Sequence, residues 1–285
     1  MITVTLTTDW GTDGFYTGAF KGCLVARVPG VQLVDISHQI EPLRISQAAW
    51  ALKNSYHYFL AKTIHIIAVG GKLSDENPVQ HICFQYKGHY FIGPNNGVWE
   101  MIFNEEFPSI ETYKLPQVLP KAHAHAENKF HAFPELGMYI DAIGRLAMGE
   151  RPNHIGEKIE AVRGRKIGLA ARMPDSLQGE IICFDVYGNA ITNITKKDFD
   201  KVGLGRPFTI RVGSMRKETT TDKIAKNYYD GAKSGFIMAL FSFSGYLEIA
   251  LPNDNFKKYF SHVDKNTKLT VRFFNSEEEK EASLH

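Results

Sequence analysis

The chain has 285 residues, 44% of them hydrophobic, which is typical of a globular protein with one large domain or two. Its 33 basic and 31 acidic residues give a formal net charge of +2 with no lysine or arginine run, which argues against nucleic acid or another polyanion as partner. No run of about eighteen apolar residues and no signal-like amino terminus is visible, so we expect a cytoplasmic protein without membrane association.

The first stretch predicts a buried strand, a tight turn and a helix. An apolar run at residues 2–6 leads into Thr-Thr-Asp-Trp-Gly at residues 7–11, and Gly14, Gly18 and Gly22 then predict a closely packed helix. In open α/β sheets a ligand binds beyond the carboxyl ends of the strands, where an acidic residue can accept ribose hydroxyls. Asp9 is the candidate for that role, and a cap on the following helix is the alternative.

The next elements continue the alternation of strand and helix. Apolar patterns predict a strand at 31–36, a helix at 42–58, a strand at 63–69, a hairpin at 81–92 and a helix at 133–149. The hairpin turns at Lys87-Gly88 and leads into Gly-Pro-Asn-Asn-Gly at residues 93–97. The asparagines there can read an adenine edge or simply build the turn, and the turn is favoured on local grounds.

The second half of the chain has a different character. Residues 151–176 lose their periodicity and predict a linker, after which short strands are expected at 180–185, 208–212, 235–241, 245–251 and 268–274. We therefore predict an α/β domain with a mostly parallel sheet at residues 1–172, followed by a small all-β, barrel-like domain at residues 173–285. The charged end at residues 277–285 is expected to fray.

Cysteines and histidines give little support for a metal. Cys23, Cys83 and Cys183 lie far apart and are expected to be buried, inert thiols. His123, His125 and His131 lack a carboxylate or cysteine at useful spacing, so an exposed connector is favoured over a metal site.

Six segments, in order, resemble the S-adenosyl-L-methionine (SAM) hydroxide adenosyltransferase family, which also includes SAM-dependent chlorinases and fluorinase. They are Thr-Asp-Trp-Gly-x-Asp at 8–13 with Lys21-Gly22, Asp-Ile-Ser-His-x-Ile-x-Pro at 35–42, Tyr-x-Tyr-Phe at 56–59 with Thr63-x-His65, Gly-Pro-Asn-Asn-Gly at 93–97, Tyr-Gly-Asn-Ala-Ile-Thr-Asn-Ile at 187–194 and Ser-Gly-Tyr-Leu-Glu-Ile-Ala at 244–250. No single segment is specific; their shared order carries the resemblance.

The resemblance implies a homotrimer in which SAM lies between the α/β domain of one subunit and the β domain of its neighbour. It implies attack at C5′ of the ribose with loss of methionine, without a metal or added cofactor. Asp9 would hold the ribose hydroxyls and Asn189 the methionine, with a left-handed turn as the alternative for Asn189. The implied substrate-binding residues are Asp9, Trp10, Asn95, Tyr187, Asn189, Ser244 and Tyr246.

The chain departs from this family at the groups that handle water. Water-using members carry an Asp in Val-Val-Asp-Pro-Gly-Val-Gly, an Arg shortly after it, and a His in Phe-His-Gly-Arg-Asp. Here Gly70 replaces the Asp, no arginine follows, and only His131 is kept as the expected catalytic residue. Asp75 or Glu135 can replace the missing acid if either reaches the same space.

Two functions therefore stay open. The first is slow hydrolysis of SAM to adenosine and L-methionine, weakened because general-base assistance is reduced. The alternative is a catalytically inactive protein that binds SAM or adenosine. A purely structural trimer is disfavoured because Asp9 and Asn189 are retained.

Overall fold

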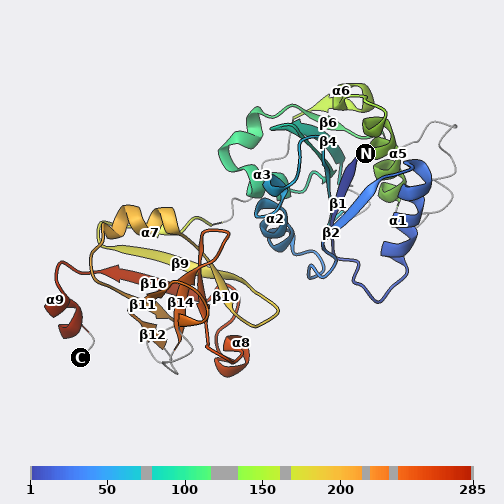
Figure 1. Cartoon of the computed structure of the whole chain (residues 1–285). Helices are drawn as coiled ribbons and strands as arrows, with labels where there is room; N and C mark the ends of the chain where they lie inside the picture. Colours follow the sequence, from blue (N-terminus) through green and yellow to red (C-terminus); the bar gives the residue numbers. More distant parts are fainter. Residues whose placement is uncertain are drawn as a thin grey trace. The chain divides into compact units, whose positions relative to one another are not determined.

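The computed structural model describes residues 2–71, 79–116, 134–160, 168–213, 219–230 and 237–283. The chain forms two compact units, Met1–Lys166 and Ile167–His285 (Figure 1). The division falls inside the polar stretch at 151–176, six residues before the boundary predicted after residue 172.

The first unit is a sheet with helices on both faces. Its strands are β1 (Thr3–Thr8), β2 (Gln32–Ser37), β3 (Ile64–Ala68), β4 (His81–Tyr86), β5 (His89–Pro94), β6 (Thr112–Lys114) and β7 (Glu157–Ile159). Its helices are α1 (Tyr16–Arg27), α2 (Ile45–Lys53), α3 (Val98–Phe103), α5 (Pro134–Ala147) and α6 (Pro152–Ile155), with 3₁₀ turns η1 (Tyr56–Tyr58) and η2 (Asn104–Ser109). The predicted elements between residues 2 and 94 are confirmed to within a few residues.

The sheet is mixed, so the prediction of a mostly parallel sheet is wrong. In the order β2-β1-β3-β5-β4-β6-β7, the pairs from β2 to β5 are parallel and those from β5 to β7 are antiparallel. The two-residue turn at Lys87 and Gly88, both with positive φ, closes a tight hairpin that makes β4 antiparallel to β5. Strand β7 lies inside the predicted linker and extends the sheet.

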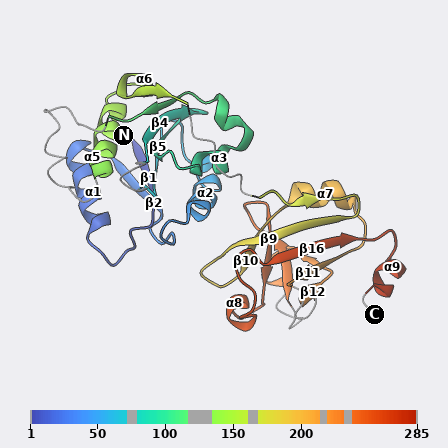
Figure 2. The ribbon, with the colours of Figure 1, turned by 180° about the vertical axis from the view of Figure 1, so that it is seen from behind.

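Two helical layers bury the sheet. Helices α1 and α5 lie together on one face and α2 and α3 lie on the other, as both ribbon views show (Figures 1 and 2). The α1 side is packed by Phe20, Leu24, Tyr139 and Ile143 against β1 and β3. Buried strands of this kind place their carboxyl ends at one edge of the sheet, where the β1–α1 loop emerges.

The close packing predicted from the glycines of α1 is wrong. Gly14, Gly18 and Gly22 are exposed, and a β-carbon built at Gly18 or Gly22 would meet no atom within 4 Å. The face that packs carries Phe20 and Leu24 instead. The glycine spacing thus marks the solvent side of this helix.

The second unit is dominated by one sheet that curls on itself as a half-barrel (Figure 1). Its strands are β8 (Ala171–Arg172), β9 (Ser176–Phe184), β10 (Ala190–Thr195), β11 (Phe208–Val212), β12 (Thr219–Thr221), β13 (Ile224–Ala225), β14 (Met238–Phe241), β15 (Tyr246–Ala250) and β16 (Lys268–Phe273). The strand order is β12-β11-β16-β9-β10-β15-β14-β13, with β8 beside β9. Because β13 and β14 pair in parallel, this sheet is also mixed.

Short helices correct the all-β prediction for this unit. They are α7 (Lys196–Gly203), α8 (Phe256–Tyr259) and α9 (Glu277–Ala282). The hydroxyls of Thr195 and Ser276 cap α7 and α9 by accepting the amides of Asp198 and Glu279, three residues later. The end expected to fray is therefore helical from Glu277 to Ala282.

None of the helices in the described ranges has the length and apolarity that a membrane crossing requires.

Candidate functional site

A cavity of about 350 Å³ lies at the carboxyl ends of β1 and β3. Five segments contribute to it: the β1–α1 loop, the start of α1, the β2–α2 loop, the end of β3 and the first turns of α5. The lining residues are Asp9, Trp10, Tyr16, Leu43, Ala68, Gly70, Gly71, Glu135, Leu136 and Tyr139. The structure thus places Asp9 and Trp10 together, at the turn where the sequence predicts a ligand.

Asp9 does not cap the helix that follows it. Helix α1 begins seven residues later, and its N-cap, Phe15, makes no side-chain cap bond. Instead, the Leu43 amide donates to Asp9 Oδ2 at 3.3 Å. Burial raises the pKa of Asp9, and hydrogen bonds from the backbone of Leu43, Asp9 and Gly70 partly offset that rise. The carboxylate is half-buried and faces the cavity.

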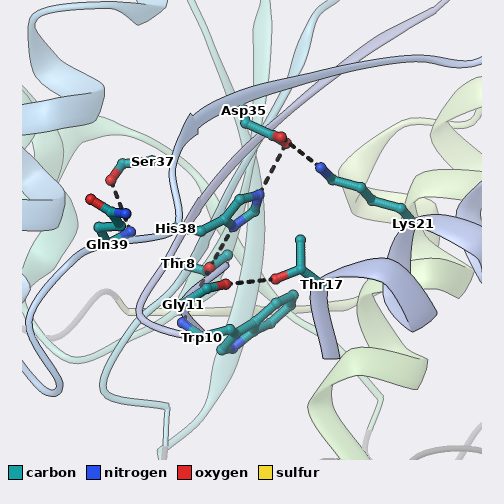
Figure 3. A network of polar contacts seen from close by, with 9 residues as sticks. All are labelled: Thr8, Trp10, Gly11, Thr17, Lys21, Asp35, Ser37, His38 and Gln39. Carbon is teal, nitrogen blue, oxygen red and sulfur yellow. Dashed lines mark hydrogen bonds and ion pairs between the residues drawn. The ribbon is translucent and has the colours of Figure 1, made fainter. Parts of the chain in front are cut away.

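A polar network fixes the end of β1 (Figure 3). Thr8 Oγ1 lies 2.7 Å from His38 Nδ1, and His38 Nε2 lies 3.0 Å from Asp35 Oδ1. Lys21 Nζ donates to Asp35 Oδ2 at 2.6 Å. Burial acts to raise the pKa of Asp35, but hydrogen bonds and charges from Lys21 and His38 outweigh it and lower that pKa.

Backbone contacts clamp the β1–α1 turn to the next loop. The Gly11 amide donates to the His38 carbonyl at 2.8 Å, and the Ile40 amide donates to the Thr8 carbonyl at 3.3 Å. The hydroxyl of Thr17 donates to the Gly11 carbonyl at 3.2 Å (Figure 3). The segment at residues 35–42 therefore positions the two residues after β1.

The end of β3 is held by Asn96, the second of the two asparagines that the sequence assigns to a turn or to an adenine edge. Asn96 Nδ2 donates to the carbonyls of Val69 and Gly70, each at 3.1 Å, and Asn96 Oδ1 accepts the Val98 amide at 3.2 Å. Its neighbour Asn95 is buried, and the backbone amide of Asn95 donates to the Gln80 carbonyl at 2.7 Å. Asn95 is not among the described residues that line the cavity, so its role in ligand binding stays a prediction.

Helix α5 brings a second carboxylate to the cavity. Glu135 lies in its first turn, and Glu135 Oε1 is 3.7 Å from the position that a β-carbon on Gly71 would occupy. One turn later, Tyr139 is fully buried, with its hydroxyl 2.6 Å from His81 Nδ1. Burial lowers the pKa of His81 to about 4, despite its hydrogen bond to the Gly71 backbone.

Several predicted residues lie outside the described ranges. These are the expected catalytic His131, the candidate acid Asp75, and the histidines at 123 and 125. In the part of the chain that the structure describes, no group of three or more His, Cys, Asp or Glu side chains is arranged to hold a metal ion.

In the second unit, Asn189 is anchored by an aspartate that sequence reasoning missed. Asp185 Oδ1 accepts the amides of Tyr187 and Asn189 at 3.0 and 2.8 Å, and Asp185 Oδ2 accepts Asn189 Nδ2 at 2.9 Å. Gly188, with φ of 84°, takes the left-handed position, so the turn alternative for Asn189 is wrong. Asn189 is buried, whereas Tyr187 is 73% exposed.

The predicted residues of this unit fall into two places. Asn189 directly precedes Ala190, which pairs with Ile249, whereas Tyr246 pairs with Thr195 at the other end of β10. Ser244 Oγ lies 2.7 Å from Ser242 Oγ in the turn before β15. Within one copy of this unit, therefore, the structure does not bring Tyr187 and Asn189 together with Ser244 and Tyr246.

Comparisons with known proteins agree with the segment order. The SAM hydroxide adenosyltransferase N-terminal domain matches residues 4–156 and the C-terminal domain of the same family matches residues 179–268. A protein of Methanocaldococcus jannaschii named (R)-S-adenosyl-L-methionine hydrolase is 28% identical over 265 residues, covering 90% of each chain. A fluorinase of Actinoplanes sp. is 25% identical over 269 residues, covering 85% of this chain and 88% of its own.

A solved structure shares the fold. The crystal structure of an uncharacterized conserved protein from Thermotoga maritima superposes with a TM-score of 0.75 at 23% identity, covering 95% of this chain and all of that one. The two family domains together account for most of the chain, in the order in which the two units occur. The chain therefore belongs to the SAM hydroxide adenosyltransferase family.

Proposed function

We propose that this protein binds SAM and hydrolyses it to adenosine and L-methionine by attack of water at C5′. The observation that carries the proposal is the Asp9 carboxylate at the cavity, held by Leu43 and by the network behind Thr8. Two family relatives, from Methanocaldococcus jannaschii and Thermus thermophilus, bear the name (R)-S-adenosyl-L-methionine hydrolase, which supports the reaction.

The electrostatics of the cavity suit a cationic ligand. Among the described residues that line it, the charged ones are Asp9 and Glu135, and three more are aromatic: Trp10, Tyr16 and Tyr139. Carboxylates and aromatic faces both attract a desolvated cation. SAM carries such a charge on its sulfonium, next to the carbon that would react.

The protein does not have to assist departure of the sulfur leaving group. The sulfonium leaves as a neutral thioether, so the leaving group needs no proton. The chain must hold C5′ in line with a water molecule and keep bulk water out, which alignment in a closed pocket provides. We expect EDTA to leave the rate unchanged.

The remaining ligand contacts belong to the same proposal. Trp10 would pack beside the nucleoside, Asn95 would serve the base, and Tyr187, Asn189, Ser244 and Tyr246 would complete the site from the second unit. A site shared between neighbouring subunits requires a closed oligomer, and a homotrimer is part of this proposal. Light scattering at micromolar concentration should give the mass of three chains.

An inactive SAM- or adenosine-binding protein is the second candidate. The observation that favours it is Gly70, which has no side chain where water-using relatives carry an acid. Incubation of the purified protein with SAM, followed by chromatography, separates the two functions. Hydrolysis gives adenosine and methionine in equal amounts, whereas a binding protein returns SAM unchanged.

Asp9→Ala tests the site in either case. Loss of the acceptor for two ribose hydroxyls should weaken SAM or adenosine binding by about 2–4 kcal/mol, roughly 30- to 1,000-fold. Calorimetry measures this, with Glu157→Gln as a control that removes an exposed carboxylate outside the cavity. Affinity unchanged by Asp9→Ala would remove Asp9 from the site.

A further inference from the structure

We propose that Glu135, on helix α5, holds and deprotonates the attacking water. It would take the role of the Asp that Gly70 replaces. This inference rests on the proposed hydrolysis and names the group that receives the proton. It differs from the sequence-based expectation that water activation is largely lost.

The first observation is the position of the carboxylate. Glu135 lines the same cavity as Asp9 and Gly70, although it is 65 residues away from Gly70 in the sequence. Its Oε1 atom lies 3.7 Å from where a β-carbon of Gly71 would be, so it occupies space beside the end of β3. A side chain at residue 70 would point toward Asn96 and Ile45, so Glu135 reaches the same cavity from a different wall.

The second observation is how that wall is fixed. Tyr139 lies one helical turn after Glu135 on the same face of α5, and its hydroxyl meets His81 Nδ1 at 2.6 Å. His81 also has a hydrogen bond to the Gly71 backbone. A neutral imidazole that donates to the Gly71 carbonyl accepts a hydrogen bond from the Tyr139 hydroxyl at Nδ1. This chain of contacts ties α5, and with it Glu135, to the loop after β3.

The third observation is the division of labour between the two carboxylates. Asp9 accepts the Leu43 amide and sits at the end of β1, where the ribose hydroxyls are expected. Glu135 faces it from another element of the same cavity. Two acids on different walls can thus serve different atoms, one the hydroxyls and the other the nucleophile.

The step balances without a further reactant. A C5′–O bond forms as the C5′–S bond breaks, and the electron pair of that bond leaves on sulfur as methionine. One proton of the water passes to Glu135 and then to solvent. The products are adenosine, methionine and one proton, so no redox partner or metal is needed.

The test compares Glu135→Gln with the unmodified protein and with Glu157→Gln. Adenosine formation from SAM should fall about 100-fold or more in Glu135→Gln, the usual size of general-base assistance. The Kd for SAM should rise by a much smaller factor than the rate falls, and Glu157→Gln should leave both unchanged. The rate of the unmodified protein should also fall at acid pH as a carboxylate loses its charge, and Glu135→Gln should flatten that limb.

A rescue separates a chemical role from a structural one. Gly70→Asp in the Glu135→Gln background returns a carboxylate to the opposite wall and should recover part of the rate. A carboxylate that only balanced the sulfonium charge would instead change the Kd for SAM much more than the Kd for its uncharged thioether analogue, S-adenosylhomocysteine.

The outcomes are distinct. Turnover in the unmodified protein that survives Glu135→Gln but is abolished by Asp75→Asn would overturn the role of Glu135 and leave the hydrolysis intact. Absence of turnover in the unmodified protein, with SAM bound, would overturn both the hydrolysis and this role.

Discussion

Gly70→Ala tests whether the end of β3 depends on glycine. Gly70 has φ of 65°, a left-handed conformation that costs a residue with a β-carbon roughly 1–2 kcal/mol. The new β-carbon would also lie 3.1 Å from Asn96 Nδ2 and 3.2 Å from Ile45 Cγ2, both tight contacts. Displacing Asn96 strains its bonds to the Val69 and Gly70 carbonyls, each worth about 1 kcal/mol.

Together these effects predict a loss of about 2 kcal/mol, which lowers the melting temperature of a unit of this size by about 4–8 °C. The chain has three tryptophans, Trp10, Trp50 and Trp99, and all lie in the first unit, so their fluorescence on heating reports its unfolding. Gly18→Ala is the matched control. It lies in α1 with open space around it and should stabilise the unit by roughly 0.5–1 kcal/mol.

A melting temperature that stays the same or rises in Gly70→Ala would refute the conformational argument. Asp is better tolerated than Ala in the left-handed region, so Gly70→Asp should lose less stability. That difference makes Gly70→Asp usable for the rescue experiment.

Two further predictions concern stability. Burial, with a smaller effect from His89, lowers the pKa of His65 to about 3, and burial lowers the pKa of His81 to about 4. The unfolded chain therefore binds up to two more protons than the folded chain between pH 6 and 4, and the free energy of unfolding should fall by up to about 2.7 kcal/mol per pH unit near pH 5. Urea unfolding at several pH values measures that slope, and stability that does not change with pH would contradict it. Leu43 has φ of 64° and is 70% exposed, so Leu43→Gly should keep or raise the melting temperature, and a drop of more than about 4 °C would disprove backbone strain there.

Local chemistry in the sequence determined most of the elements. The continuous apolar run of β3 and the Lys87-Gly88 turn were sufficient to predict a buried strand and a hairpin. The same turn already implied an antiparallel pair, which the prediction of a mostly parallel sheet overlooked. Capping residues such as Ser276, followed by Glu279, predict a helix at the charged end, and overlooking them led to the expectation of fraying.

Only part of the candidate site could be predicted from the sequence. Asp9 could be proposed because a strand end marks the ligand edge of an α/β sheet, and Trp10 because of the family resemblance. The glycines of α1 misled because spacing does not say which face of a helix meets the sheet, and here Phe20 and Leu24 do. The roles of His38 and Asn96 depend on contacts to Thr8 and Gly70, which the pairing of β1 with β2 and of β3 with β5 brings near.

Tertiary structure alone decided which acid shares the cavity with Asp9. Glu135 and Tyr139 lie more than a hundred residues from Asp9, and they reach the cavity because α5 packs beside α1 over β1 and β3. Such packing depends on the register of strands and the facing of helices, which arise from contacts between distant residues. The sequence shows that Glu135 is present. Whether its carboxylate lines the cavity is decided only when α5 packs on the sheet.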